Sequence, residues 1–184
     1  TLSHCLACLA RASGGRRGLP FRKEESEMAK RFYIAYGSNL NIPQMRKRCP
    51  CATVVGTAVI EDYRLLFRGS KTGAYLTVEP WKGGRVPVAV WEVTDEDERR
   101  LDQYEGYPAF YRKESMELDV TLVGSGRGQS MECFAYVMQD GRPLGKPSNM
   151  YFYTCSQGYQ SFGFDVQFLY DAYYISKGGK HVEW

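Results

Sequence analysis

The amino-acid sequence predicts an α+β fold in which a small β-barrel-like sheet, antiparallel or mixed, carries a few flanking helices. Strand-like runs of aromatic and β-branched residues outnumber helical patterns, Gly and Pro separate these runs at hairpin-length intervals, and no internal repeat is present. With 184 residues, of which 43% are hydrophobic, the chain has the size of one globular domain with its own core.

The first predicted strand covers residues 31–35 (RFYIA), whose aromatic and β-branched side chains are typical of a buried strand. It leads into YGSNL at 36–40, where Gly, Ser and Asn end a strand and favour a turn. A short helix is expected at 43–48, with Pro43 near its first turn. Further strand-like runs, bounded by Gly and Pro, are expected at 53–60, 63–67, 74–78 and 86–93.

The middle of the chain contains a helix with clear boundaries. Thr94 and Asp97 have the spacing of a capping box, and Gly106 is a natural end for the helix that they begin. Strands at 110–122 and 131–138 are expected to follow, joined by a Gly-rich hairpin.

Two helices are expected at the C-terminal end. Ser148 is predicted to cap a helix that ends at Gly163, and the tyrosines at 151 and 159 lie on one face of it. Asp165 is predicted to cap the last helix.

Composition excludes several classes of protein. The formal net charge is only +3, whereas nucleic-acid-binding domains carry a clustered basic excess, so no nucleic-acid partner is expected. No run approaches the roughly 18–20 apolar residues that cross a bilayer, so no membrane partner is expected. Six cysteines in a chain of this length are too sparse for a disulfide scaffold, which predicts reduced thiols and a cytoplasmic location.

Residues 1–27 differ in character from the remainder. They include a Gly/Arg-rich stretch at 13–18, and the first methionine is Met28. We expect 1–27 to be a disordered or non-native leader and 28–184 to form the single domain. Under the second alternative the natural protein starts at Met28, which an intact-mass measurement of the protein expressed from its own gene would test.

Three separate segments carry candidate chemistry. In YGSNL, the small residues Gly37 and Ser38 let backbone NH groups approach an anion, although such a loop is often only a turn. In DQYEGYP, Glu105 lies at a helix C-terminus, where negative charge is unfavourable and therefore suggestive of a functional site; the alternative is a surface carboxylate. In PSNMY, Tyr151 belongs to a Tyr-rich region that either lines a polar cavity or fills the core.

The ordered combination YIAYGSNL, LDQYEGYP and PSNMY resembles the γ-glutamylcyclotransferase (AIG2-like) family over about residues 31–163. The resemblance implies a γ-glutamylcyclotransferase-like fold with one active-site cavity, and it makes Glu105 the catalytic carboxylate. The segment after Tyr151 departs from the animal enzymes, so the leaving-group pocket is left open. The implied substrate-binding residues are the loop Tyr33, Ile34, Ala35, Tyr36, Gly37, Ser38, Asn39 and Leu40, together with the cavity tyrosines Tyr111, Tyr136 and Tyr151.

The resemblance also implies a reaction. The α-amino nitrogen of a small-molecule γ-glutamyl substrate attacks its own γ-carbonyl, which releases an amine or amino acid and forms 5-oxoproline. Glu105 acts first as general base and then as general acid. No cofactor is needed, and the protein is expected to be a monomer or homodimer.

Rival functions find less support in the sequence. No metal is expected, because Cys49 and Cys51 are separated by a single residue and the pair Cys5 and Cys8 lies in the leader. Nucleophilic catalysis is disfavoured, because His181 is the only histidine after the leader and no GxSxG motif occurs. The alternative that stays open is a non-catalytic ligand-binding module of the same fold.

Overall fold

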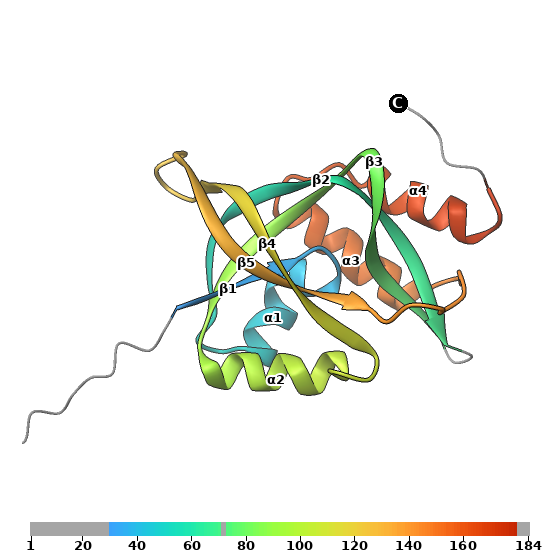
Figure 1. The fold of residues 1–184 in the computed structure, drawn as a ribbon, viewed down its shortest axis with the longest axis horizontal. Helices are drawn as coiled ribbons and strands as arrows, with labels where there is room; N and C mark the ends of the chain where they lie inside the picture. The colour runs from blue at the N-terminus through green and yellow to red at the C-terminus, as the bar shows by residue number, and fades with distance from the viewer. Residues whose placement is uncertain (1–29, 71–72, 180–184) are drawn as a thin grey trace, which may run out of the picture.

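The computed structural model describes residues 30–70 and 73–179, and in them five strands close into a barrel in the order β1-β3-β2-β4-β5 (Figure 1). Neighbouring strands are antiparallel except β1 and β5, which run parallel and pair Tyr33 with Phe134. The mixed barrel confirms the predicted fold class. The strands are β1 (Arg31–Ala35), β2 (Thr53–Ser70), β3 (Gly73–Val93), β4 (Tyr111–Leu122) and β5 (Gly128–Met138).

The prediction of four short strands between 53 and 93 is wrong, because β2 and β3 are two long strands that continue past the predicted breaks. Asp62 adopts a left-handed φ of 59°, and the pairing register shifts between Glu61 and Tyr63. On β3 the pairing partner changes from Arg85, opposite Glu61, to Pro80, opposite Tyr63, and the segment between them contains two glycines. A bulge of this kind absorbs residues that would otherwise interrupt a strand.

The helices begin and end at capping residues. The side chain of Asn41 accepts from the backbone NH of Gln44 and caps α1 (Ile42–Arg48), so this helix begins one residue earlier than predicted. The capping box of Thr94 and Asp97 is present at the start of α2 (Asp95–Glu105). Gly106 ends α2 with a φ of 64°, which makes Glu105 the last residue of the helix.

One of the two caps predicted for the C-terminal helices is confirmed. The Ser148 hydroxyl accepts from Tyr151 NH at the start of α3 (Asn149–Ser161). The prediction that Asp165 caps the last helix is wrong, because the N-cap of α4 (Gln167–Ser176) is Val166, which makes no side-chain cap bond; the Asp165 carboxylate instead accepts from Gln167 NH at 2.9 Å in the turn before the helix. Figure 1 shows α2 along one side of the barrel, with α3 and α4 on another.

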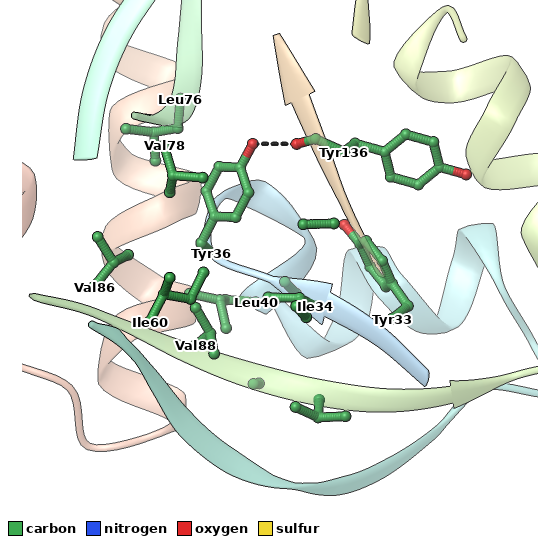
Figure 2. Close-up of a cluster of buried hydrophobic side chains, with 14 of the residues drawn as sticks. Tyr33, Ile34, Tyr36, Leu40, Ile60, Leu76, Val78, Val86, Val88 and Tyr136 are labelled. Atoms are coloured by element: carbon green, nitrogen blue, oxygen red, sulfur yellow. Dashed lines mark hydrogen bonds between the residues drawn. The ribbon is translucent and has the colours of Figure 1, made fainter. Parts of the chain in front are cut away.

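The barrel interior holds the hydrophobic core. Ile34, Val86 and Val88 are fully buried next to Ile60 and Leu40 (Figure 2). Burial of each such side chain stabilises the fold by about 1.5–3 kcal/mol, which gives the short strand β1 a fixed position between β3 and β5. Within the described ranges, no helix is both long and apolar enough to span a bilayer. The predicted leader, residues 1–27, lies outside the described residues.

Candidate active site

A small cavity lies where β1 ends, and it is enclosed by segments that are far apart in the sequence. Its volume is about 30 Å³. Nine of the predicted site residues line it, and Leu76 of β3 is the one lining residue that sequence reasoning missed. The lining residues are Tyr33, Tyr36, Gly37, Ser38, Asn39, Leu76, Glu105, Tyr111, Tyr136 and Tyr151.

Small residues allow the loop after β1 to pack closely against its neighbours. A Cβ atom on Gly37 would lie 3.3 Å from the Tyr151 hydroxyl. From Gly37 the chain enters a short 3₁₀ turn, η1 (Ser38–Leu40), against which α3 packs directly. A Cβ atom on Gly158 of α3 would lie only 2.6 Å from the Cβ of Leu40, so this contact requires glycine.

Asn39 connects the loop to the carboxylate of Glu105. Its side-chain amide nitrogen donates to Oε1 of Glu105 at 2.9 Å and to the Tyr33 hydroxyl at 2.7 Å. Its amide oxygen accepts a hydrogen bond from Arg48. Asn39 is buried, and these three bonds satisfy both of its amide donors and its acceptor, as a buried polar side chain requires.

The environment of Glu105 favours its protonated form. The residue as a whole is half-buried, but its carboxylate lines the cavity and is bonded to the buried Asn39 amide. Burial raises the pKa of Glu105 to about 7, against the opposing effects of the Arg48 charge and the Asn39 hydrogen bond. A carboxyl group with a pKa near neutrality can both accept and donate a proton at physiological pH.

The cavity tyrosines divide into two groups by the direction of their hydroxyl bonds. Tyr36 donates to the main-chain oxygen of Tyr136, as Figure 2 shows, and Tyr111 donates to the main-chain oxygen of Leu76 at 2.8 Å. Tyr136 contributes its ring to the cavity but donates its hydroxyl to Asp102 on α2.

The hydroxyls of Tyr33 and Tyr151 are acceptors in their bonds to Asn39 and to the backbone NH of Leu76. The Tyr33 hydroxyl can therefore still donate its own proton to a ligand, and the Tyr151 hydroxyl, which also contacts the Cys155 thiol, can do so while that thiol is the donor. Burial raises the pKa of both phenols well above the usual value, so they are neutral donors at physiological pH.

Three predicted substrate-binding residues do not line the cavity. Ile34, Ala35 and Leu40 are fully buried in the hydrophobic core and support the loop from behind. Arg48 contacts the site although the sequence analysis did not predict it. No sequence pattern indicates that the C-terminal end of α1, which carries Arg48, lies close to the C-terminal end of α2, which carries Glu105. The sequence held a signal at Gly158, because a glycine costs helix propensity and its presence inside a helical pattern is compatible with close packing.

Two larger grooves flank the barrel. One, of about 510 Å³, lies between the β2–β3 and β4–β5 hairpins, but its charged side chains pair with one another. Arg68 bonds to Glu79, and Arg112 bonds to Glu114. The other, of about 590 Å³, opens where β2 and β4 diverge. The smaller cavity therefore holds the stronger candidate chemistry.

The described part of the chain brings together no group of three His, Cys, Asp or Glu side chains able to hold a metal ion. Its cysteines, at positions 49, 51, 133 and 155, are free thiols. The leader cysteines Cys5 and Cys8, together with His181, lie outside the described residues.

Fold and site together define a class of small mixed β-barrel protein, in which one carboxylate shares a tyrosine-lined cavity with a small-residue loop. The family described as gamma-glutamyl cyclotransferase, AIG2-like, matches residues 33–154. The chain belongs to this family.

Several relatives carry related names. The gamma-glutamylcyclotransferase of Bos taurus is 26% identical over 147 residues, which cover 74% of this chain and 73% of the relative. The gamma-glutamylaminecyclotransferase of Rattus norvegicus is 30% identical over 79 residues, which cover 42% of this chain and 53% of the relative.

Solved structures share the fold. A gamma-glutamyl cyclotransferase superposes with a TM-score of 0.64 at 22% identity, over 84% of this chain and 90% of the other. An uncharacterized protein from Homo sapiens gives a TM-score of 0.66 at 23% identity, with the same coverage of both chains.

Proposed function

We propose that this protein is a cyclotransferase that releases an amine or amino acid from a γ-glutamyl compound and forms 5-oxoproline. The contact between Asn39 and Glu105 carries the proposal, because it joins a carboxyl group with a pKa of about 7 to the small-residue loop across one cavity. Membership of the family supports the same activity.

Glu105 supplies the acid–base chemistry of the proposed reaction. The α-ammonium of the substrate is inert as a nucleophile until a base removes a proton, and the Glu105 carboxylate takes that proton. The nitrogen then attacks the γ-carbonyl carbon, and the C–N bond to the amine breaks as Glu105 returns this proton to the departing nitrogen. The attacking nitrogen loses its second proton on becoming the lactam NH, and the same carboxylate passes that proton to the released amine, which leaves as an ammonium. The ring closes without water or a protein nucleophile, and effective molarities of about 10⁵ M or more are available to such intramolecular attack.

The loop and the tyrosines bind the substrate in this proposal. Ser38 and Asn39 begin η1, and the first NH groups of a helix lack acceptors within it, so they are suited to the γ-carbonyl oxygen. Each such donor is typically worth about 3 kcal/mol in the transition state. The neutral hydroxyls of Tyr33 and Tyr151 supply further donors for the α-carboxylate.

The cavity must open to admit the substrate. Its volume of about 30 Å³ is close to that of one water molecule, whereas ligand pockets usually exceed about 300 Å³. Tyr104 directly precedes Glu105 and Tyr107 follows it by two residues, and both are exposed. Tyr104 stacks on the Arg48 guanidinium and Tyr107 packs on Tyr136, so the widening has to preserve or replace these contacts.

Replacement of Glu105 tests the proposal. Glu105→Gln keeps the shape of the side chain but removes the proton shuttle, so 5-oxoproline release should fall by at least ~10²-fold while the fold persists. Glu96→Gln, at an exposed position on the same helix, is the matched control and should leave turnover unchanged. Near wild-type 5-oxoproline release by the Glu105 variant would refute the assignment.

A substrate panel separates the enzyme from the non-catalytic binding module. Because the bovine and rat relatives are named for γ-glutamyl and γ-glutamylamine substrates, the panel should contain γ-glutamyl amino acids and γ-glutamyl amines. Chromatography for 5-oxoproline after each incubation identifies a turned-over substrate. Saturable binding of panel members by calorimetry, without product from any of them, would support the binding module instead.

A further inference from the structure

Arg48, the last residue of α1, contacts the site although it does not line the cavity. One guanidinium nitrogen donates to the side-chain oxygen of Asn39, and another donates to Oε1 of Gln44 at 2.8 Å. The guanidinium plane also lies over the ring of Tyr104, with its central carbon 3.6 Å from the ring centroid. These three contacts fix the side chain in one orientation.

The fixed guanidinium determines which way the Asn39 amide faces. Arginine can only donate hydrogen bonds, so the amide group must turn its oxygen toward Arg48. The amide nitrogen then faces the opposite way, where it donates to Oε1 of Glu105 and to the Tyr33 hydroxyl. If the amide were reversed, its oxygen would lie against the carboxylate and repel it.

We propose that Arg48 is a positioning residue for the reaction: it orients Asn39 so that one carboxylate oxygen of Glu105 is held and the other is left to exchange a proton with the substrate. This inference rests on the proposed function. Arg48 touches no reacting atom, and its effect passes through Asn39.

Arg48 also acts on Glu105 through its charge. A nearby cation favours the ionised carboxylate, and Arg48 accordingly opposes the rise in the pKa of Glu105 that burial causes. Arg48 is the side chain among the described residues whose charge lowers the pKa of Glu105. Asp102, one turn earlier on α2, is paired with Lys113 and accepts from the Tyr136 hydroxyl. The other titratable groups that interact with Glu105 are neutral at physiological pH: Tyr33 on β1, Tyr36 after it, Cys49 after α1, Tyr104 on α2, Tyr111 on β4 and Tyr151 on α3.

Three variants test this role. Arg48→Met keeps the length of the side chain but removes both the donors and the charge. Arg48→Lys keeps the charge but cannot reproduce the planar fork that holds Asn39 and Gln44 together. Arg46→Met, at an exposed position in the same last turn of α1, is the control. For each variant, kcat and KM are measured from pH 5 to 9 with a γ-glutamyl substrate that the wild type turns over, and folding is checked by thermal melting.

Arg48→Met should lower kcat by ~10- to ~100-fold and shift the acid limb of kcat/KM upward by about 1 pH unit, because misplacement of the base slows reaction and loss of the cation raises its proton affinity. Arg48→Lys should keep the acid limb near its wild-type position while kcat falls less. Arg46→Met should match the wild type.

A purely structural role would lower the melting temperature or the active fraction without moving the acid limb. The inference would be overturned if a folded Arg48→Met protein had the kcat of the wild type and an unmoved acid limb. It would also be overturned if the acid limb stayed in place and the loss of activity were explained by a smaller fraction of active protein. Absence of 5-oxoproline from the wild type with every panel substrate would instead refute the proposed function, so the two failures are distinguishable.

Discussion

The carboxyl group of Glu105 should make the protein less stable as the pH rises. Its pKa is about 7 in the folded protein, against 4.5 for the unperturbed group. Between these values the folded state binds a proton that the unfolded state has released, so the free energy of unfolding falls with rising pH. The contribution of this group is fully present below about pH 4.5 and is lost as the pH rises through about 7.

The size of the effect follows from the shift. The difference between these two pKa values, at about 1.4 kcal/mol per unit, corresponds to about 3.5 kcal/mol, and partial exposure of the residue reduces this to roughly 2–3 kcal/mol. Glu105→Gln removes the titration but keeps the acceptor for Asn39. The variant should therefore gain stability relative to the wild type by roughly 2–3 kcal/mol between pH 5 and pH 8.

Urea denaturation of both proteins at pH 5, 6, 7 and 8 measures this difference, and other titrating groups cancel because they are common to both. Glu132→Gln, at an exposed position on β5, serves as the control and should show no comparable change in the difference. A difference between Glu105→Gln and wild type that stays constant from pH 5 to pH 8 would show that the buried carboxyl group does not have the raised pKa on which the acid–base role depends.

Other consequences follow from the same contacts. The kcat/KM of the wild type should fall about tenfold per pH unit below pH ~7, as Glu105 becomes protonated, and a pH–rate profile measures this limb. Gly158→Ala should destabilise the protein by ~1–3 kcal/mol in urea denaturation and lower turnover, because the added Cβ would lie 2.6 Å from an atom of η1. Gly128→Ala is the control: its added Cβ meets nothing within 4 Å, so stability and turnover should stay unchanged. Tyr111→Phe leaves the buried main-chain oxygen of Leu76 without its donor and should cost ~1–3 kcal/mol in thermal or urea denaturation; a cost near zero would show that this bond does not anchor β3 to the cavity.

Local patterns in the sequence were sufficient where the controlling interactions are themselves local. The bonds between Thr94 and Asp97 span three residues, and the left-handed φ of Gly106 depends on a conformation that glycine adopts without strain. These signals placed Glu105 correctly at the end of α2. The breaks predicted in β2 and β3 failed for the opposite reason, because long-range pairing between the two strands outweighs the local preference of Asp62 and Pro80.

Local sequence patterns could not predict which residues come together in the site. Glu105 and Asn39 are 66 residues apart, and only the order of the three motifs indicated that they share one cavity. That order carried no information about which side of β1 faces the cavity, so Ile34 was included although it belongs to the core. Alternation along the strand turns Tyr33 toward the cavity and Ile34 away from it, a distinction that needs the pairing with both β3 and β5.

The cavity contains a feature that works against the stability of the fold. An acid is buried at the C-terminal end of α2, where both desolvation and the helix dipole oppose its charge. Glu105→Gln removes this cost, but it also removes the group that exchanges the proton. If this substitution raises stability but reduces 5-oxoproline release, the unfavourable acid is there for the chemistry, since its charge is not needed to close the barrel.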